Sequence, residues 1–199
     1  GKGVIGSGQK EEDPVRILQT CNAHDTLMFF MNNGRVYVEK AYEIPEGSRT
    51  SKGRNIINFL NMQKDESVAA LISVDSFESE ESLILCTKKG IVKKTKINAY
   101  KNHRKGGIIG INIDEGDSVL QALRANVDDH LLLLSKNGKG LRFCCDQLRD
   151  QGRVTRGVRG IRLKPKDAVV NMLVVEENKL LLIAGQNGLG IRTRFSAFL

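Results

Sequence analysis

The sequence predicts an all-β protein of propeller-like architecture, built from about four sheets, or blades, of four strands each. Three observations support this fold: a repeat of about 50 residues, short strand-like runs within each copy, and glycine-bearing turns between paired runs. The chain has 199 residues, of which 20 are glycine and three are proline. We expect a single domain, or part of one, with approximate repeats at 1–52, 53–106, 107–156 and 157–199.

Two independent motifs recur along the chain with the same period of about 50 residues, which gives the length of the repeat. In the first, an apolar run and a few polar residues lead to a glycine, at Gly34, Gly90, Gly138 and Gly188. In the second, a basic loop with a glycine leads into an isoleucine-containing run, at Gly3, Gly53, Gly107 and Gly157. Each set spans 154 residues over three intervals. The two motifs stay in phase, which indicates four copies of one unit.

Each copy contains runs of apolar and β-branched residues bounded by turn formers, which is typical of strands. In the first copy these runs are Val15–Cys21, Leu27–Met31, Val36–Lys40 and Ile56–Leu60. The pairs Asn33-Gly34, Asn137-Gly138 and Asn187-Gly188 predict tight hairpins, because both residue types tolerate positive φ. One such sheet cannot bury both of its faces, so the blades must stack around an axis.

Positive charge recurs at fixed places in the repeat. The chain carries 31 Lys and Arg against 23 Asp and Glu, a net charge of +8. Counted from the hairpin glycine, basic residues fill three of four positions at +4 and again at +6, and more follow in the next loop. Stretches 88–105 and 152–166 contain no acid. The predicted contact residues are Lys2, Arg35, Lys40, Arg49, Lys52, Arg54, Lys93, Lys94, Lys96, Arg104, Lys105, Lys139, Arg142, Arg153, Arg156, Arg159, Arg192 and Arg194.

A regular series of cations favours a duplex DNA backbone as the partner, because phosphates recur along the duplex and carry no base information. The chain has no Trp and only three Tyr, which argues against recognition of single strands by stacking. With about eight phosphate contacts, we expect a logarithmic salt slope near −7. The alternatives are a solvated outer edge protected by lysine and a propeller that serves as a platform for protein partners.

The sequence offers no basis for catalysis within this chain. Cys21, Cys86, Cys144 and Cys145 lack metal-ligand spacing, and no phosphate-binding loop of the P-loop type occurs. No apolar run approaches the 20 residues of a membrane span. The chain does not begin with Met, so we expect it to be a piece of a longer protein. We therefore expect a binding domain with no catalytic residue, cofactor or metal of its own, and no membrane association.

Several motifs together resemble the C-terminal domain of the DNA gyrase A protein. They are Gly1-Lys2-Gly3, the acidic-basic segment 9–13, His24-Asp25, Gly34-Arg35-Val36-Tyr37, the segment 157–163 and Gln186-Asn187-Gly188. Gly1-Lys2-Gly3 is similar to the end of that family's gyrase-A box, whose first four residues are absent here. The resemblance implies a β-pinwheel, a propeller with altered strand connectivity and usually six blades.

The resemblance also implies a function. Family members wrap duplex DNA around a basic rim, so that a bacterial, cytoplasmic and nucleoid-associated type II topoisomerase introduces negative supercoils. ATP and Mg would be used on other segments, and the partners would be double-stranded DNA, the rest of gyrase A and the gyrase B protein, in a heterotetramer. A second interpretation with the same fold is the corresponding domain of topoisomerase IV, which carries a degraded box and fewer blades.

Overall fold

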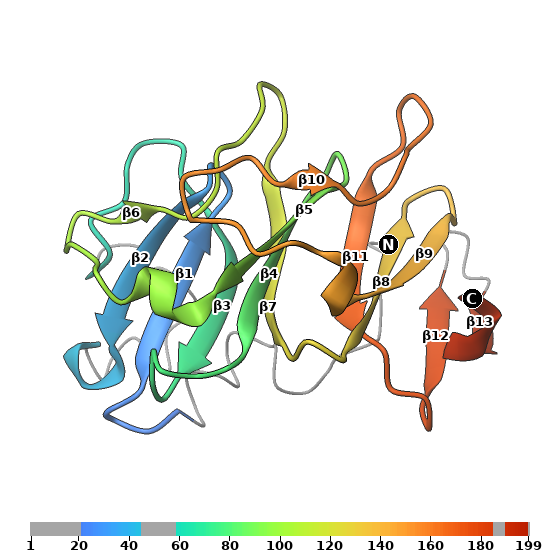
Figure 1. Ribbon diagram of the computed structural model, residues 1–199. Helices are drawn as coiled ribbons and strands as arrows, with labels where there is room; N and C mark the ends of the chain where they lie inside the picture. The colour runs from blue at the N-terminus through green and yellow to red at the C-terminus, as the bar shows by residue number, and fades with distance from the viewer. Residues whose placement is uncertain (1–20, 45–58, 185–189, 199) are drawn as a thin grey trace.

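The computed structural model describes residues 21–44, 59–184 and 190–198. Thirteen strands form four antiparallel sheets within these residues, placed side by side along the molecule (Figure 1). Each sheet is built on one hairpin, and the hairpins are β1 (Thr26–Met31) with β2 (Arg35–Lys40), β4 (Ser82–Thr87) with β5 (Ile91–Lys96), β8 (His130–Ser135) with β9 (Gly140–Cys144), and β12 (Leu180–Ala184) with β13 (Gly190–Arg194).

The remaining strands come from later in the chain. β3 (Val68–Val74), β7 (Val119–Ala125) and β11 (Val169–Val174) pair with the first strands of the first three hairpins, and they contact one another along the inner side. Two short strands, β6 (Ile108–Ile109) and β10 (Val158–Arg159), pair backwards with β2 and β5. We call β6 and β10 the straps, and β2, β5, β9 and β13 the outer strands.

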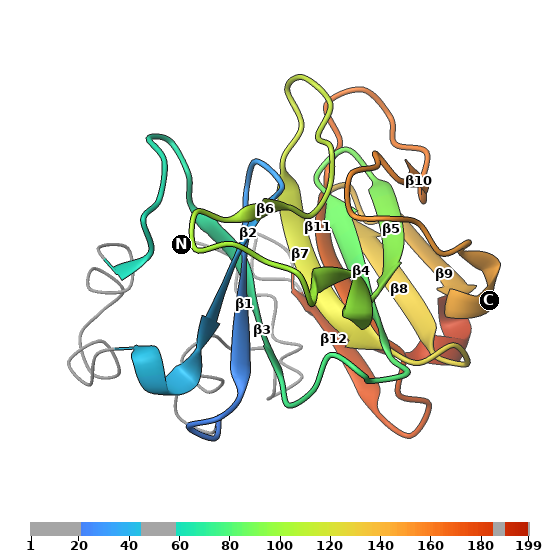
Figure 2. The ribbon, with the colours of Figure 1, turned by 60° about the vertical axis from the view of Figure 1, so that its left-hand side comes forward.

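The straps link neighbouring sheets. β6 follows the second hairpin but completes the first sheet, and β10 follows the third hairpin but completes the second (Figures 1 and 2). The sheets therefore contain four, four, three and two described strands, in the orders β3-β1-β2-β6, β10-β5-β4-β7, β11-β8-β9 and β12-β13. Strands of one sheet thus cross the predicted repeat boundaries: β3, β7 and β11 join the sheet of the preceding copy, and β6 and β10 join the sheet two copies earlier.

Side chains that point alternately to the two faces of a strand form the hydrophobic core between neighbouring sheets. In β4, Leu83 and Leu85 point into a cluster shared with the first sheet, whereas Ile84 and Cys86 point into a cluster shared with the third. All six residues of β4 are buried. Residues two apart in a strand share a face, so a strand apolar at every position is suited to a place between two other sheets. This explains the unbroken apolar runs in the sequence.

The hairpin turns differ in one respect from the prediction. Gly34, Gly90 and Gly138 have φ of +91°, +90° and +85°, but their preceding residues are not among the positive-φ residues of the described chain. The amide of each glycine donates to the carbonyl three residues earlier, as from Gly34 to Met31 at 3.0 Å. The turn is thus a type I turn closed by a left-handed glycine, and it forms equally at Lys89-Gly90 without an asparagine.

Two strands predicted in the first copy lie largely outside the described residues, and the few residues of them that are described are not in strands. Of Ile56–Leu60, only Phe59 and Leu60 are described, and they are helical and turn residues. Val15–Cys21 lies outside the described residues except for Cys21, which is in a bend. Each outer strand is followed by a short 3-10 helix, namely η1 (Ala41–Glu43), η3 (Ile97–Tyr100), η4 (Cys145–Gln147) and η5 (Phe195–Phe198).

Candidate nucleic-acid interface

The predicted cations lie mainly on the outer strands, the straps and the loops that join them, but the structure divides them by burial. Position +4 is covered in the first two outer strands, where Val38 is in the core and Lys94 is only 9% exposed, whereas Arg192 at +4 of the fourth hairpin is exposed. The Lys94 ammonium donates to the Cys145 carbonyl at 3.1 Å and pairs with Asp150 at 3.5 Å. Arg142, also at +4, donates to Glu177 and has a side chain only 9% exposed.

Position +6 faces solvent. Lys40, Lys96 and Arg194 are exposed at the ends of their outer strands. The prediction placed +4 and +6 together on an accessible face because residues two apart share a side of a strand. They do share a side, but the next sheet covers the strand up to its last residues. Lys94 and Arg142 are therefore not part of the accessible cationic surface, whereas Lys40, Lys96 and Arg194 at +6 are.

Lys93 is enclosed by backbone carbonyls. Its side chain is 1% exposed, and its ammonium lies 2.5 Å from the Gly110 carbonyl, 3.0 Å from that of Gly152 and 2.5 Å from that of Arg153. The Thr155 carbonyl lies at 3.5 Å. Burial, followed by the charge of Arg153, lowers the pKa of Lys93 to about 8. The Lys93 ammonium faces these carbonyls and not solvent, so Lys93 is not part of the accessible cationic surface.

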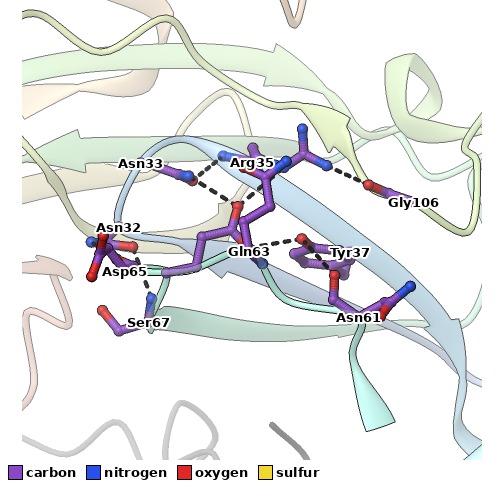
Figure 3. A network of polar contacts seen from close by, with 10 residues as sticks. Asn32, Asn33, Arg35, Tyr37, Asn61, Gln63, Asp65, Ser67 and Gly106 are labelled. Atoms are coloured by element: carbon purple, nitrogen blue, oxygen red, sulfur yellow. Dashed lines mark hydrogen bonds and ion pairs between the residues drawn. The ribbon is translucent and has the colours of Figure 1, made fainter. Parts of the chain in front are cut away.

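Arg35 belongs to a polar network at the turn of the first hairpin (Figure 3). Its guanidinium donates to the Gly106 carbonyl and pairs with Glu66 at 3.1 Å. Glu66 also accepts from Asn33 at 2.9 Å and from the Tyr37 hydroxyl at 2.7 Å. Burial alone raises the pKa of the Glu66 carboxyl, but the bonds it accepts, beginning with that from Asn33, hold the pKa below its ordinary value. Arg35 thus fastens the loop before β6.

Three further predicted cations contact the protein itself. Arg153 donates to the carbonyls of Ala99 at 2.7 Å and Ile109 at 2.8 Å. Arg156 makes a two-pronged ion pair with Asp114, with Nε 2.7 and 2.8 Å from the two carboxylate oxygens, and this pair is exposed. Lys139 donates to the Arg162 carbonyl at 2.5 Å. These cations stabilise loops beside the straps, and Arg156 and Lys139 remain exposed.

The accessible part of the predicted set is smaller than the sequence indicated. Six exposed cations make no side-chain hydrogen bond or ion pair with other described residues, although the charge of one, Lys105, acts on Glu39. They are Lys96, Arg104, Lys105, Arg159, Arg192 and Arg194. Lys40 is also exposed and reaches the His24 carbonyl at 3.3 Å. These residues lie on outer strands, a strap and the loop before β6, in the first, second and fourth sheets. Four predicted residues, Lys2, Arg49, Lys52 and Arg54, lie outside the described residues.

Sequence reasoning missed one set of residues that shapes this surface. An acidic side chain receives a bond from each described hairpin turn: Glu66 from Asn33, Asp117 from the Lys89 amide at 3.0 Å, and Asp167 from the Asn137 amide at 3.0 Å. The three acids recur at the repeat length, just before β3, β7 and β11. That period was available in the sequence, but only glycines and cations were compared. Exposed Arg162 and Lys164 also lie in the acid-free stretch 152–166 and were not selected.

Other kinds of site have little support in the described chain. No group of three or more His, Cys, Asp and Glu side chains there is placed to hold a metal ion. Cys86, Cys144 and Cys145 form no disulfide. Helices long and apolar enough to cross a bilayer are absent from the same residues. The feature that stands out is therefore the cationic outer side.

Comparisons with known proteins agree with this architecture. The chain matches a family described as "DNA gyrase C-terminal domain, beta-propeller" at residues 25–75, 81–126, 129–176 and 179–199. It is 40% identical over 200 residues to the DNA gyrase A protein of Mycolicibacterium smegmatis, covering 100% of this chain and 24% of that protein. It is 41% identical over 199 residues to the gyrase A protein of Deinococcus deserti, covering 97% of this chain and 24% of that protein. The chain thus spans about a quarter of these relatives.

Solved structures of C-terminal domains from this kind of enzyme have a similar fold. The C-terminal domain of a DNA topoisomerase IV superposes with a TM-score of 0.80 at 26% identity, covering 88% of this chain and 55% of that one. A DNA gyrase A C-terminal domain superposes with a TM-score of 0.72 at 31% identity, covering 88% and 56%. The repeated hairpins, the all-β fold and the four matched segments lead to one conclusion: the chain belongs to the family of DNA gyrase C-terminal domains, of the β-propeller type.

Proposed function

We propose that this domain binds duplex DNA along its outer side and bends it, as the DNA-wrapping part of a bacterial gyrase A protein. The observation that carries the proposal is the set of exposed cations on β5, β10, β13 and the loop before β6, which form no ion pair with other described residues. Bending 20–30 base pairs costs roughly 1–6 kcal/mol. A series of phosphate contacts at moderate salt offsets a cost of that size.

The proposed role of the parent protein follows from the relatives, which are DNA gyrase A proteins. The parent is a type II topoisomerase of the bacterial cytoplasm and nucleoid that uses ATP and Mg on other segments, together with the rest of gyrase A and with gyrase B. This domain presents a bent duplex to it, so that strand passage leaves negative supercoils. The domain itself carries out no chemical step.

A titration of duplex affinity against salt tests the binding proposal. If the six cations without ion-pair partners each neutralise one phosphate, the logarithmic slope is about −5, since each contact contributes about −0.9. Sequence-scrambled duplexes are expected to bind equally, because the contacts are to the backbone. A slope near zero, or a strong preference for one sequence, contradicts the proposal.

One observation favours a second candidate, the corresponding domain of topoisomerase IV, because the solved domain of that enzyme superposes with the higher of the two TM-scores. The sequence relatives described above, at 40% and 41% identity, are gyrase proteins, and we therefore prefer gyrase. The two candidates differ in wrapping: a gyrase domain fixes a shift in linking number in closed circular DNA, whereas a domain that only selects substrate geometry binds without that shift.

A further inference from the structure

We infer that Lys93 is a positioning residue: its buried ammonium fastens the loop 150–157 to the second sheet, and thereby presents the cations of that loop and of β10 on the outer side. The part of this inference that concerns DNA rests on the proposed function. The part that concerns the loop stands on the contacts alone.

The first argument is the place of Lys93 in the repeat. It lies three residues after the hairpin glycine, where the other three copies have Tyr37, Leu141 and Ile191. The fold therefore accommodates aromatic or aliphatic side chains at this position. A lysine here must be desolvated, and burying an ammonium is unfavourable unless its donors are satisfied. The lysine is thus not required by the propeller-like packing, and another role has to explain it.

The second argument is the identity of its partners. Three of the four carbonyls around the ammonium, those of Gly152, Arg153 and Thr155, belong to one loop, and the fourth belongs to Gly110 beside the β6 strap. None of these partners is a carboxylate. A lysine has three donors and no acceptor, so it binds well at a point where several carbonyls converge. The ammonium therefore joins a segment without regular structure to β5 and β6.

The third argument is what else holds this loop. The Gln151 amide donates to the Lys94 carbonyl at 2.8 Å, and the Asn112 amide donates to the Thr155 carbonyl at 2.8 Å. Arg153 extends from the loop to the carbonyls of Ala99 and Ile109. Lys94 holds the start of the loop, since its buried ammonium lies 3.5 Å from the Asp150 carboxylate, and Arg156 pairs with Asp114 near the end of the loop. Lys93 is the buried cation that contacts the middle of the loop, at the Gly152, Arg153 and Thr155 carbonyls. Its removal therefore leaves a segment that opens locally without unfolding the sheets.

The consequence lies at the end of the loop. Arg156 is exposed four residues before Gly160, and Arg159 is exposed within β10 itself. β10 has only two residues and is paired to β5 through Val158 and Arg159. Such a short strand depends on the segment before it for its register. Lys93 thus acts on the outer surface from inside the molecule, without contact with the ligand.

The test uses Lys93→Ala with chemical rescue by n-propylammonium, which supplies the three carbons and the ammonium that the substitution removes. Tetramethylammonium at the same concentration is the control, because it has the charge but no donor, and ionic strength is held constant with sodium chloride. Limited trypsin digestion, followed by mass spectrometry, reports opening of the loop without DNA. Affinity for a fluorescent 40-base-pair duplex reports presentation of the cations.

We expect cleavage after Arg153 and Arg156 to rise about tenfold in Lys93→Ala, while cleavage after Lys179 stays unchanged. Affinity for DNA is expected to fall about fivefold, and n-propylammonium, but not tetramethylammonium, reverses both changes. Lys96→Ala is the matched control: it removes an exposed cation of the same strand, so it lowers the salt slope by about one and leaves cleavage unchanged.

Three outcomes would overturn the inference. Unchanged cleavage with a salt slope lowered by about one means that Lys93 contacts phosphate directly. Cleavage that rises equally at all sites means that Lys93 supports the fold as a whole. In that case Lys93→Met, which fills the same space without a charge, restores resistance to trypsin at every site if only the side-chain volume matters. Loop opening without any change in affinity means that the loop does not present cations to DNA. If the wild type does not bind the duplex, the proposed function fails, whereas the digestion still decides the role in the loop.

Discussion

The straps of the first and second sheets are held by equivalent backbone hydrogen bonds but by different side-chain contacts. The Gly110 amide donates to the Gly34 carbonyl at 2.8 Å, and the Gly160 amide donates to the Gly90 carbonyl at 2.8 Å. In the first sheet, the cation beside the strap, Arg35, is neutralised by Glu66. In the second, the cation is Lys93, and its hydrogen-bond partners among the described residues are backbone carbonyls.

This difference shows which part of the repeat is fixed and which part varies. The glycine and the backbone bonds recur because the strap approaches too closely for any side chain at that point. The side chains that secure the loop differ between the two sheets, since both a carboxylate and a group of carbonyls can accept the hydrogen bonds of a cation. They differ in electrostatics, since only the first arrangement compensates the charge.

The largest expected effect concerns the glycines. A Cβ at Gly34 would lie 2.3 Å from the Ile111 carbonyl oxygen, and φ there is +91°. Gly34→Ala is therefore expected to lower the free energy of unfolding by about 3 kcal/mol or more, from clash and backbone strain together. Gly138→Ala is the control, because nothing lies within 4 Å of its Cβ, and it is expected to cost about 1 kcal/mol. Urea unfolding measures both, and equal losses would show that strap contact does not matter.

A smaller effect is expected at the charged partner in the first sheet. Glu66→Ala removes the carboxylate that Arg35 and Tyr37 share, which is only 1% exposed, and leaves them the Gly106 and Asn61 carbonyls as acceptors. We expect a loss of about 2–3 kcal/mol in unfolding free energy. Asp117→Ala, which removes the equivalent acid of the second hairpin, is expected to cost about 1 kcal/mol, because it accepts only backbone amides at 3.0 and 2.8 Å. The comparison is wrong if Asp117→Ala costs more.

The uncompensated lysine of the second sheet makes stability depend on pH. Its pKa is about 8 in the fold, below its ordinary value of 10.5, so the unfolded chain binds more protons between these values. Unfolding free energy therefore rises with pH in this window. The difference between wild type and Lys93→Met is expected to shift in favour of the wild type by about 1–2 kcal/mol from pH 8 to 9.5. A shift of the opposite sign would contradict the described burial.

The smallest effect separates two neighbours on β5. Lys96→Glu is expected to weaken duplex binding several-fold and to leave urea unfolding within about 0.5 kcal/mol, because the side chain is exposed. Lys94→Glu is expected to lower stability instead, since its ammonium lies between sheets beside Asp150. Fluorescence anisotropy and urea unfolding on both variants test this. Equal binding by wild type and Lys96→Glu would remove that strand end from the interface.

Much of the fold was predictable because its period was present in the residues. The hairpins at Leu27–Met31 and Val36–Lys40 formed as expected, since apolar runs and a turn glycine determine a local pairing. The origin of the straps was not predictable, because β6 and β10 have two residues each and pair with strands about 70 residues earlier. The accessibility of the predicted cations was not predictable for a related reason: whether Lys94 or Lys96 is covered depends on where the next sheet ends, and periodicity contains no such information.

The central claim is that duplex DNA curves along the outer side of this domain. Its most direct test is to bind the domain to relaxed closed circular DNA, treat the complex with a nicking-closing enzyme, remove the protein and measure the linking number. We predict a shift of one sign that grows with the amount of bound protein and is reduced in a Lys96→Glu, Arg159→Glu double variant. Saturated binding with an unchanged linking number would contradict this claim.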